Sequence, residues 1–197
     1  MRTPLTAIPR APRSDAVRNR AAVIGAARKV MAKKGVDAGM DEIARAAGVG
    51  VGTVYRHFPT KDDLILGVIR ARFERLAARA EAELENPDAW SGLEATLRFG
   101  AELQAADKGL SQCIGYRAAG MDEMVAETGL PEAMEELIAR ALEQGSIRAG
   151  YTARDVGPMM CSLAATMVTH PEYDWNRLLT VMLDGIRATE REPLPQI

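Results

Sequence analysis

The segment GVGTVYRHFPTK, residues 50–61, contains the side chains of this chain that are best suited to chemistry with a partner. Arg56 has a guanidinium whose two donors match O6 and N7 of guanine. Thr53 has a hydroxyl that can hydrogen-bond a phosphate or a base edge, and Gly52 permits close approach of the backbone. This combination predicts contact with the major groove of DNA.

Helical periodicity indicates which side chains of this segment face outward. On a helix that begins near Gly50, a step of about 100° per residue places Val54 and Phe58 on one side, so both must face a core. Arg56 then lies almost opposite that side. The segment therefore has an apolar face and a face that is free to read bases.

Three further polar side chains border the exposed face. Tyr55 and His57 are placed to contact the phosphate walls of a groove, and Lys61, just past the helix, is another phosphate ligand. Taken singly, Tyr55 and His57 are equally well explained as covers of a small core, and Arg56 as a solvated charge. Their grouping on one face favours DNA.

A helix-turn-helix is the element expected to hold this face. Residues 40–61 read as a short helix, a tight Gly-Val turn and a second short helix, the arrangement that places a second helix in the major groove. The apolar residues expected to pack against the second helix are Ile43, Ala47 and Val49. The first helix of the head, from Asp15 to Gly35, is amphipathic and basic.

The charge distribution agrees with a DNA-binding head. Residues 1–61 hold twelve Lys and Arg against four Asp and Glu, a balance of +8, whereas residues 62–197 have a balance of −10. DNA phosphates attract the first part and repel the second, which orients the molecule as well as holding it. The alternative is a charge imbalance with no partner.

Catalytic chemistry is not indicated. His170 stands alone beside a proline without a metal-ligand pattern, and neither Cys113 nor Cys161 has a histidine nearby in the sequence. A dinucleotide loop starting at Gly48 would need glycine where the chain has Thr53, and it would need a preceding strand. We therefore expect no enzyme activity, no cofactor and no metal.

Composition and breaks predict an all-α protein of about nine helices, because aromatic residues are few, Ala, Leu and Met are many, and no segment alternates like a strand. Pro158 predicts a kink or a late start in its helix. Capping boxes are expected at Thr60 and Thr152. The helices expected after the head span about 61–85, 88–106, 109–127 and 131–144, with two more after a loop at 145–152. The expected divisions are a basic arm (1–14), a DNA-binding domain (15–61), a helical ligand-binding and dimerisation domain (62–190) and a tail (191–197).

Location follows from what the sequence lacks. The N-terminus has no continuous apolar core of a signal peptide, and no segment reaches the roughly 20 apolar residues that cross a bilayer. The two cysteines form no disulfide framework. We expect a soluble protein in the reduced cytoplasm that does not bind membranes.

The chain resembles the TetR family of bacterial transcriptional regulators. The resemblance is close over residues 18–70 and rests on GVDAGMDEIARAAGVGVGTVYRHFPTKDDL, residues 35–64, while GSIRAGYTARDV, residues 145–156, is similar to the loop before the family's dimerisation helices. It implies a three-helix head, a helical body and repression of an operator by a homodimer. Gly39 departs from the Ser or Thr that relatives commonly have as N-cap, at a cost of a few tenths of a kcal/mol. By position, groove or phosphate contacts are implied for Gly50, Val51, Thr53, Tyr55, Arg56, His57 and Lys61.

The resemblance also implies a small-molecule effector in the body and a dimer formed by the last two helices. The effector itself is not readable, and a Met-rich stripe is as readily plain core. A DNA-binding protein without a small-molecule switch, architectural or controlled by a protein partner, is the alternative. Candidate pocket residues are Phe99, Leu103, Cys113, Tyr116, Met121, Met124 and Met134. Candidate dimer residues are Val156, Met160, Leu163, Met167, Trp175, Leu178, Leu179, Met182 and Ile186.

Overall fold

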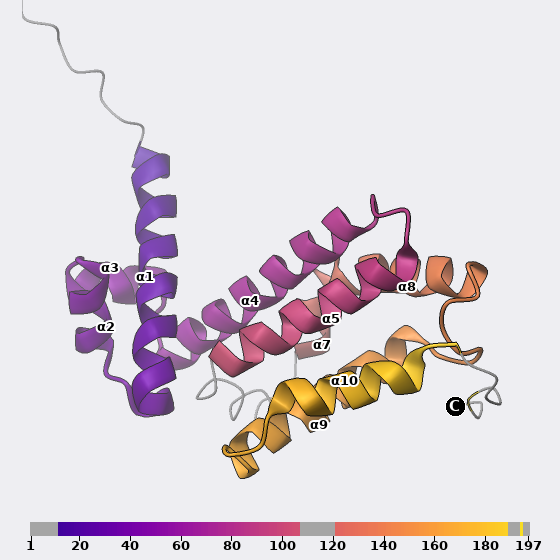
Figure 1. The fold of residues 1–197 in the computed structure, drawn as a ribbon. Helices are drawn as coiled ribbons and strands as arrows, with labels where there is room; N and C mark the ends of the chain where they lie inside the picture. The colour runs from indigo at the N-terminus through magenta and orange to yellow at the C-terminus, as the bar shows by residue number, and fades with distance from the viewer. Residues whose placement is uncertain (1–11, 107–120, 189–193, 195–197) are drawn as a thin grey trace, which may run out of the picture.

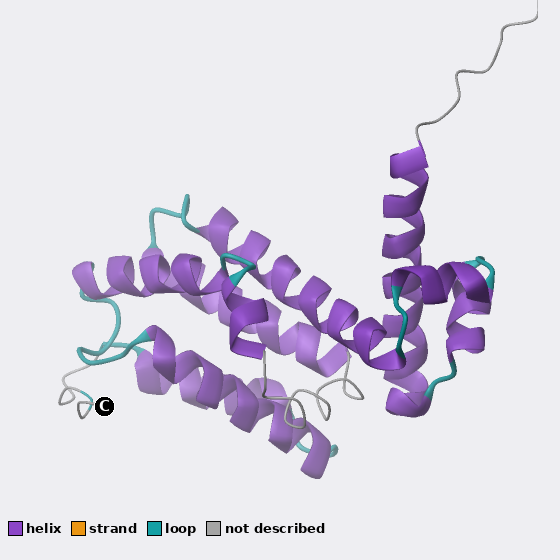
Figure 2. Ribbon diagram, turned by 180° about the vertical axis from the view of Figure 1, so that it is seen from behind, coloured by secondary structure: helices purple, strands orange, loops and turns teal. Residues whose placement is uncertain are grey.

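The computed structural model describes residues 12–106, 121–188 and 194, and within these ranges it consists of helices joined by loops and turns (Figure 1). The described part contains no strand, only one isolated bridge between Ile147 and Arg187 (Figure 2). The all-α expectation is confirmed. In the order of the chain, the elements are α1 (Pro12–Lys34), the 3₁₀ turn η1 (Gly35–Asp37), α2 (Met40–Ala47), α3 (Val51–His57), α4 (Lys61–Glu83), α5 (Ala89–Ala106), α7 (Met121–Ala126), α8 (Leu130–Glu143), α9 (Ala153–Thr169) and α10 (Trp175–Ile186).

The side chains form two hydrophobic cores. The head core joins α1, α2 and α3 to the first turns of α4, while the body core joins the rest of α4 to α5, α8, α9 and α10. Leu64 and Ile69 of α4 are fully buried in the head core, and Ala80 of the same helix is fully buried in the body core. One continuous helix therefore connects the two parts, as Figure 1 shows.

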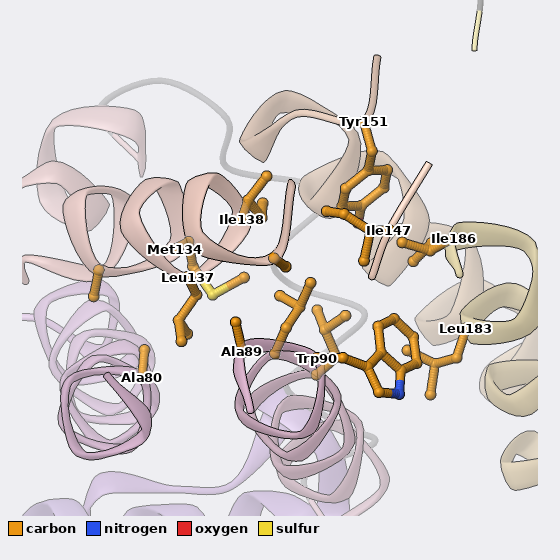
Figure 3. Close-up of a cluster of buried hydrophobic side chains, with 14 of the residues drawn as sticks. Ala80, Ala89, Trp90, Met134, Leu137, Ile138, Ile147, Tyr151, Leu183 and Ile186 are labelled. Atoms are coloured by element: carbon orange, nitrogen blue, oxygen red, sulfur yellow. The ribbon is translucent and has the colours of Figure 1, made fainter. Parts of the chain in front are cut away.

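The body core is centred on α5 and α8. Trp90 and Leu137 point into the space between helices, with Ile186 of α10 and Tyr151 of the loop before α9 closing one end (Figure 3). The Tyr151 hydroxyl is buried, and this burial raises the pKa of the phenol above its ordinary value. Among the described residues, no helix is long and apolar enough to span a membrane.

Most helix boundaries follow the sequence pattern, and the exceptions have local reasons. α1 begins at Pro12 rather than near Asp15, because a proline at the first helical position loses no hydrogen bond. α9 begins at Ala153 and continues through Pro158, so the expected late start is wrong. Proline has no N–H, so the Arg154 carbonyl loses its helical hydrogen bond. Because Arg154 and Pro158 are both exposed, water can bind that carbonyl instead. Most of the helix expected at 109–127 lies outside the described residues; its end is α7.

A capping box begins α4, as expected. The backbone N–H of Asp63 donates to Thr60 Oγ1 at 3.1 Å, and the backbone N–H of Thr60 donates to Asp63 Oδ2 at 2.9 Å. Thr152 and Asp155 form the same arrangement at α9. The start of the connecting helix is thereby set at its first residue, immediately after the head's last helix.

Loss of this cap has a measurable consequence. Thr60→Ala is expected to destabilise the protein by about 1 kcal/mol, since the backbone N–H of Asp63 loses its acceptor, Thr60 Oγ1, at the start of α4. Urea unfolding followed by circular dichroism measures the change. Thr180→Ala, at an exposed position within α10, is the control and should change stability by less than about 0.5 kcal/mol. Equal effects of the two substitutions would contradict the capping role.

Candidate DNA-binding surface

The turn between α2 and α3 is made by glycines. α2 is preceded by Gly39 in an extended conformation and ends at Gly48, which has a left-handed φ of 69°. The Gly48 N–H donates to the carbonyls of Ala44 and Arg45, so the last turn of α2 is closed in the way that favours glycine at this position. Only residues 48–50 separate the two helices, and α3 therefore leaves at a sharp angle.

The two faces of α3 are those expected from periodicity. Val54 is 0% exposed and Phe58 2% exposed, and both belong to the head core with Ile43. Ala47 and Val49 pack against the same core as partly buried neighbours. The interior side of the recognition helix is confirmed by these contacts.

The opposite side of α3 is open to a partner. Arg56 and Val51 are exposed, and the Tyr55 side chain is 48% exposed. Thr53 and His57 are half-buried rather than fully exposed, with the His57 ring tilted 54° against Phe58 at 6.4 Å between centroids. The structure thus brings all the predicted contact residues of α3 to one side, with these two at its edges.

Two glycines on this side are not needed by the fold. A Cβ atom built on Gly50 or Gly52 would meet no atom within 4 Å, and neither residue has a positive φ. The protein's own packing would accept a larger residue at both positions. Glycine at these positions leaves the start of α3 open to close approach of another backbone or ligand.

Phe58 is the residue that seats α3 on the connecting helix. A Cβ atom on Gly67 of α4 would lie 2.7 Å from Phe58 Cε1, so the ring lies directly against the α4 backbone. From α1, the Arg20 guanidinium lies over the same ring at 5.2 Å from its centroid. Residues of α1 and α4 therefore hold the end of the recognition helix in place.

Positive charge beside this surface is available to phosphates. Within the part of the chain that the structure describes, no carboxylate lies within 4.0 Å of the basic nitrogens of Arg56 or Lys61. Lys34, at the far end of α1, does pair with Glu42 at 2.7 Å. Lys34 is therefore compensated by a carboxylate of the head, whereas Arg56 and Lys61 are not.

A contact between head and body was not expected from the sequence. Met121 of α7 is buried in the head core, with Met124 packed against it. Arg70 of α4 donates to Glu127 at 2.8 Å and to Glu74 at 3.1 Å, and the Glu127 hydrogen bond raises the pKa of the guanidinium. No local pattern signals this contact, because the residues that meet lie about 50 positions apart.

Those of the predicted pocket residues that the structure describes lie in different parts of the molecule. Leu103 lines a groove beside α1, and Met124 lines a different groove beside Phe58. Met134 is 5% exposed and part of the body core, while Met121 belongs to the head core. Phe99 lies under the guanidiniums of α4, and Cys113 and Tyr116 lie outside the described residues.

The predicted dimer residues divide into two groups. One group is at most 5% exposed and packs into the chain's own core, so its side chains are not available to a second chain: Leu163, Met167, Leu179 and Ile186. The other group is partly exposed at the edge of that core: Val156, Met160, Trp175, Leu178 and Met182. The dimer surface expected from the sequence is reduced to this second group.

Comparison with known proteins agrees with this architecture. Residues 23–68 match the family described as bacterial regulatory proteins, tetR family, and residues 90–188 match the SbtR-like transcriptional regulator C-terminal domain.

Among the described residues, no cluster of His, Cys, Asp or Glu is arranged to hold a metal ion.

Solved structures of similar fold are known. A TetR transcription regulatory protein from Mycobacterium vanbaalenii is 35% identical, with a TM-score of 0.65, over 89% of this chain and 98% of that one. The Bacillus subtilis transcriptional regulator FadR, solved in complex with stearoyl-CoA, is 22% identical, with a TM-score of 0.65, over 83% of this chain and 95% of that one. The second likeness shows the fold alone.

A curated relative matches about half of the chain. An HTH-type transcriptional regulator of Staphylococcus aureus (strain USA300) is 30% identical over 104 residues, which are 52% of this chain and 56% of the relative. The chain thus spans about half the length of that relative. With a helix-turn-helix head, a matching C-terminal domain and the fold of solved family members, this chain belongs to the TetR family of DNA-binding transcriptional regulators.

Proposed function

We propose that this regulator is a homodimeric repressor that releases its operator when a small molecule binds the body. The observation that carries the proposal is that α4 belongs to both hydrophobic cores. A change in the body core moves the same rigid helix on which Phe58 and the recognition helix rest. The DNA-binding unit is residues 15–61 seated on the first turns of α4, and the body is the remainder up to residue 190.

Repression by a dimer needs two heads at a defined separation. Recognition helices that enter successive major grooves lie about 34 to 36 Å apart, or a multiple of that distance. A ligand that favours a different separation lowers operator affinity only if it binds that second state more tightly, since equal affinity shifts nothing. Met121 of α7 also packs in the head core, and Arg70 of α4 pairs with Glu127 just after α7. A movement of α7 in the body therefore changes the position of the head as well.

The proposed dimer face runs along one side of α10. Leu178 and Met182 are half-buried, and Val181, between them on the outer side, is 61% exposed although apolar. The other outer side of α10 is polar, with Thr180 and Asp184 exposed. An apolar strip on one side only is typical of a helix that packs against a second chain.

A charge on this strip is expected to separate the chains. Val181→Glu places a carboxylate in the proposed interface without touching the core, so sedimentation at micromolar concentration should show monomers that retain their helical content. Thr180→Glu, the neighbouring position on the polar side, should remain dimeric. Dimers of unchanged stability in Val181→Glu would locate the interface elsewhere.

Release by a ligand is tested on the operator itself. An operator is first selected from genomic fragments with the full chain, and metabolites that raise the melting temperature are then added to the protein–DNA complex. The fold can hold such a compound, as the FadR complex with stearoyl-CoA shows for that protein. We expect at least one stabilising compound to weaken operator binding tenfold or more. Stabilisers that leave operator affinity unchanged would instead favour control by a protein partner or an architectural role.

A further inference from the structure

A groove between α1 and α4 lies where the two hydrophobic cores meet. Its volume is about 560 Å³, within the range of sites that bind small organic molecules. Phe73 of α4, one residue after Arg72 of the groove lining, packs against both cores. The groove lies outside residues 90–188, the part that matches the C-terminal domain, so it is separate from an effector site enclosed within that part. Its apolar floor is formed by Val17, Ala21, Ile24, Val68 and Ala71.

The walls of the groove are strongly basic. Four arginines line it against a single acidic residue, Glu74. Three of these arginines have no carboxylate within 4.0 Å of their basic nitrogens in the described part of the chain: Arg20, Arg28 and Arg75. Guanidinium groups beside apolar surface attract an anion strongly, because they are weakly hydrated and pair with carboxylates through two parallel hydrogen bonds.

The fourth arginine is held from the body side. Arg72 is 7% exposed. The Gln104 side-chain amide is oriented so that its oxygen accepts from Arg72 Nη2 at 3.2 Å and its nitrogen donates to the Met160 carbonyl at 3.2 Å. Hydrogen bonds through Gln104 of α5 therefore connect the buried Arg72 guanidinium to the backbone of α9. They fix the position of this guanidinium without a ligand.

We infer that this groove binds an amphipathic organic anion, whose carboxylate pairs with the arginines and whose apolar body covers the floor between α1 and α4. The lining favours a ligand with both a negative charge and an apolar body. An inorganic anion leaves the apolar floor uncovered, and a cation is repelled by the excess of positive charge. Because such a ligand touches a helix of the head and the connecting helix together, it stabilises one angle between them. Its effect on operator binding rests on the proposed function; its binding does not.

The test is a calorimetric titration of the full chain without DNA. The probe is 2-naphthoate, an amphipathic carboxylate, and its charge-reversed counterpart is 2-naphthylmethylammonium, with the same rings. We expect saturable binding of one naphthoate per chain and at least tenfold weaker binding of the ammonium compound. Failure of this titration would overturn the groove site and leave operator binding and release by a body ligand untouched.

Two variants locate the probe. A Cβ atom on Gly25 of α1 would meet nothing within 4 Å, so Gly25→Leu fills the groove without disturbing the helix and should abolish binding. Arg28→Gln should weaken it tenfold or more, whereas Arg154→Gln, with the same loss of charge at an exposed position on α9, should not. Melting curves confirm that each variant is folded. Naphthoate binding that survives Gly25→Leu, or that falls equally in Arg28→Gln and Arg154→Gln, would refute the site.

Discussion

Phe58→Ala is expected to destabilise the head by about 3–5 kcal/mol, the usual cost of removing a buried phenylalanine from a packed core. Phe58 is 2% exposed, lies against the backbone of α4 at Gly67 and carries the Arg20 guanidinium on its ring. Domains of this size are stable by only about 5–15 kcal/mol, so the loss is a large share of the total. Urea unfolding of the variant should show a head that unfolds at much lower denaturant than the wild type.

The matched control is Tyr55→Ala, three residues earlier, where the side chain of α3 is exposed. Tyr55 is 48% exposed, so its removal should change stability by no more than about 0.5 kcal/mol while weakening DNA binding. Phe58→Ala should lose operator binding because the recognition helix is no longer held. A stability change below about 1 kcal/mol in Phe58→Ala would mean that α3 is seated by other contacts.

Arg56→Ala is expected to relax base discrimination at one operator position by about 1–3 kcal/mol, the range for a bidentate contact to a base. Arg56 is exposed opposite Val54, and in the described part of the chain it has no carboxylate within 4.0 Å. The measurement is a competition binding assay with the operator and its single-base variants. The variant should bind all bases at one position with similar affinity.

Lys61→Ala is the comparison that separates base reading from phosphate binding. Lys61 begins α4, beside the recognition helix, and is half-buried. Its removal should weaken operator and random DNA alike and reduce the slope of log affinity against log salt by about one. If Arg56→Ala also lowers affinity equally for operator and random DNA, Arg56 is a phosphate ligand and does not read a base.

The parts of the site that sequence alone predicts are those that depend on neighbours a few residues away. The burial of Val54 and Phe58 and the exposure of Arg56 follow from helical periodicity, and the capping boxes at Thr60 and Thr152 follow from residue spacing. Such features arise within one or two turns of a helix. A single sequence is sufficient to place them.

The parts that sequence alone misplaces depend on which helix packs beside which. Leu163 and Leu179 are apolar at helical spacing, which is equally consistent with a dimer face and with the chain's own core; the structure places both at 0% exposure in the core. Met121 was expected in a ligand pocket and lies in the head core instead. Periodicity says that a side chain is buried and does not say against what.

For this protein, the sequence by itself determined a basic helix-turn-helix head, the buried and exposed faces of α3 and the family to which the chain is similar. Only the tertiary structure decided that α4 is shared by two cores, that α7 reaches the head through Met121, and that arginines of α1 and α4 line one groove. The physical reason is the separation along the chain of the residues that interact. Hydrogen bonds and periodicity act along a helix, whereas packing joins residues far apart in the chain, and its outcome depends on the shapes of all the helices together.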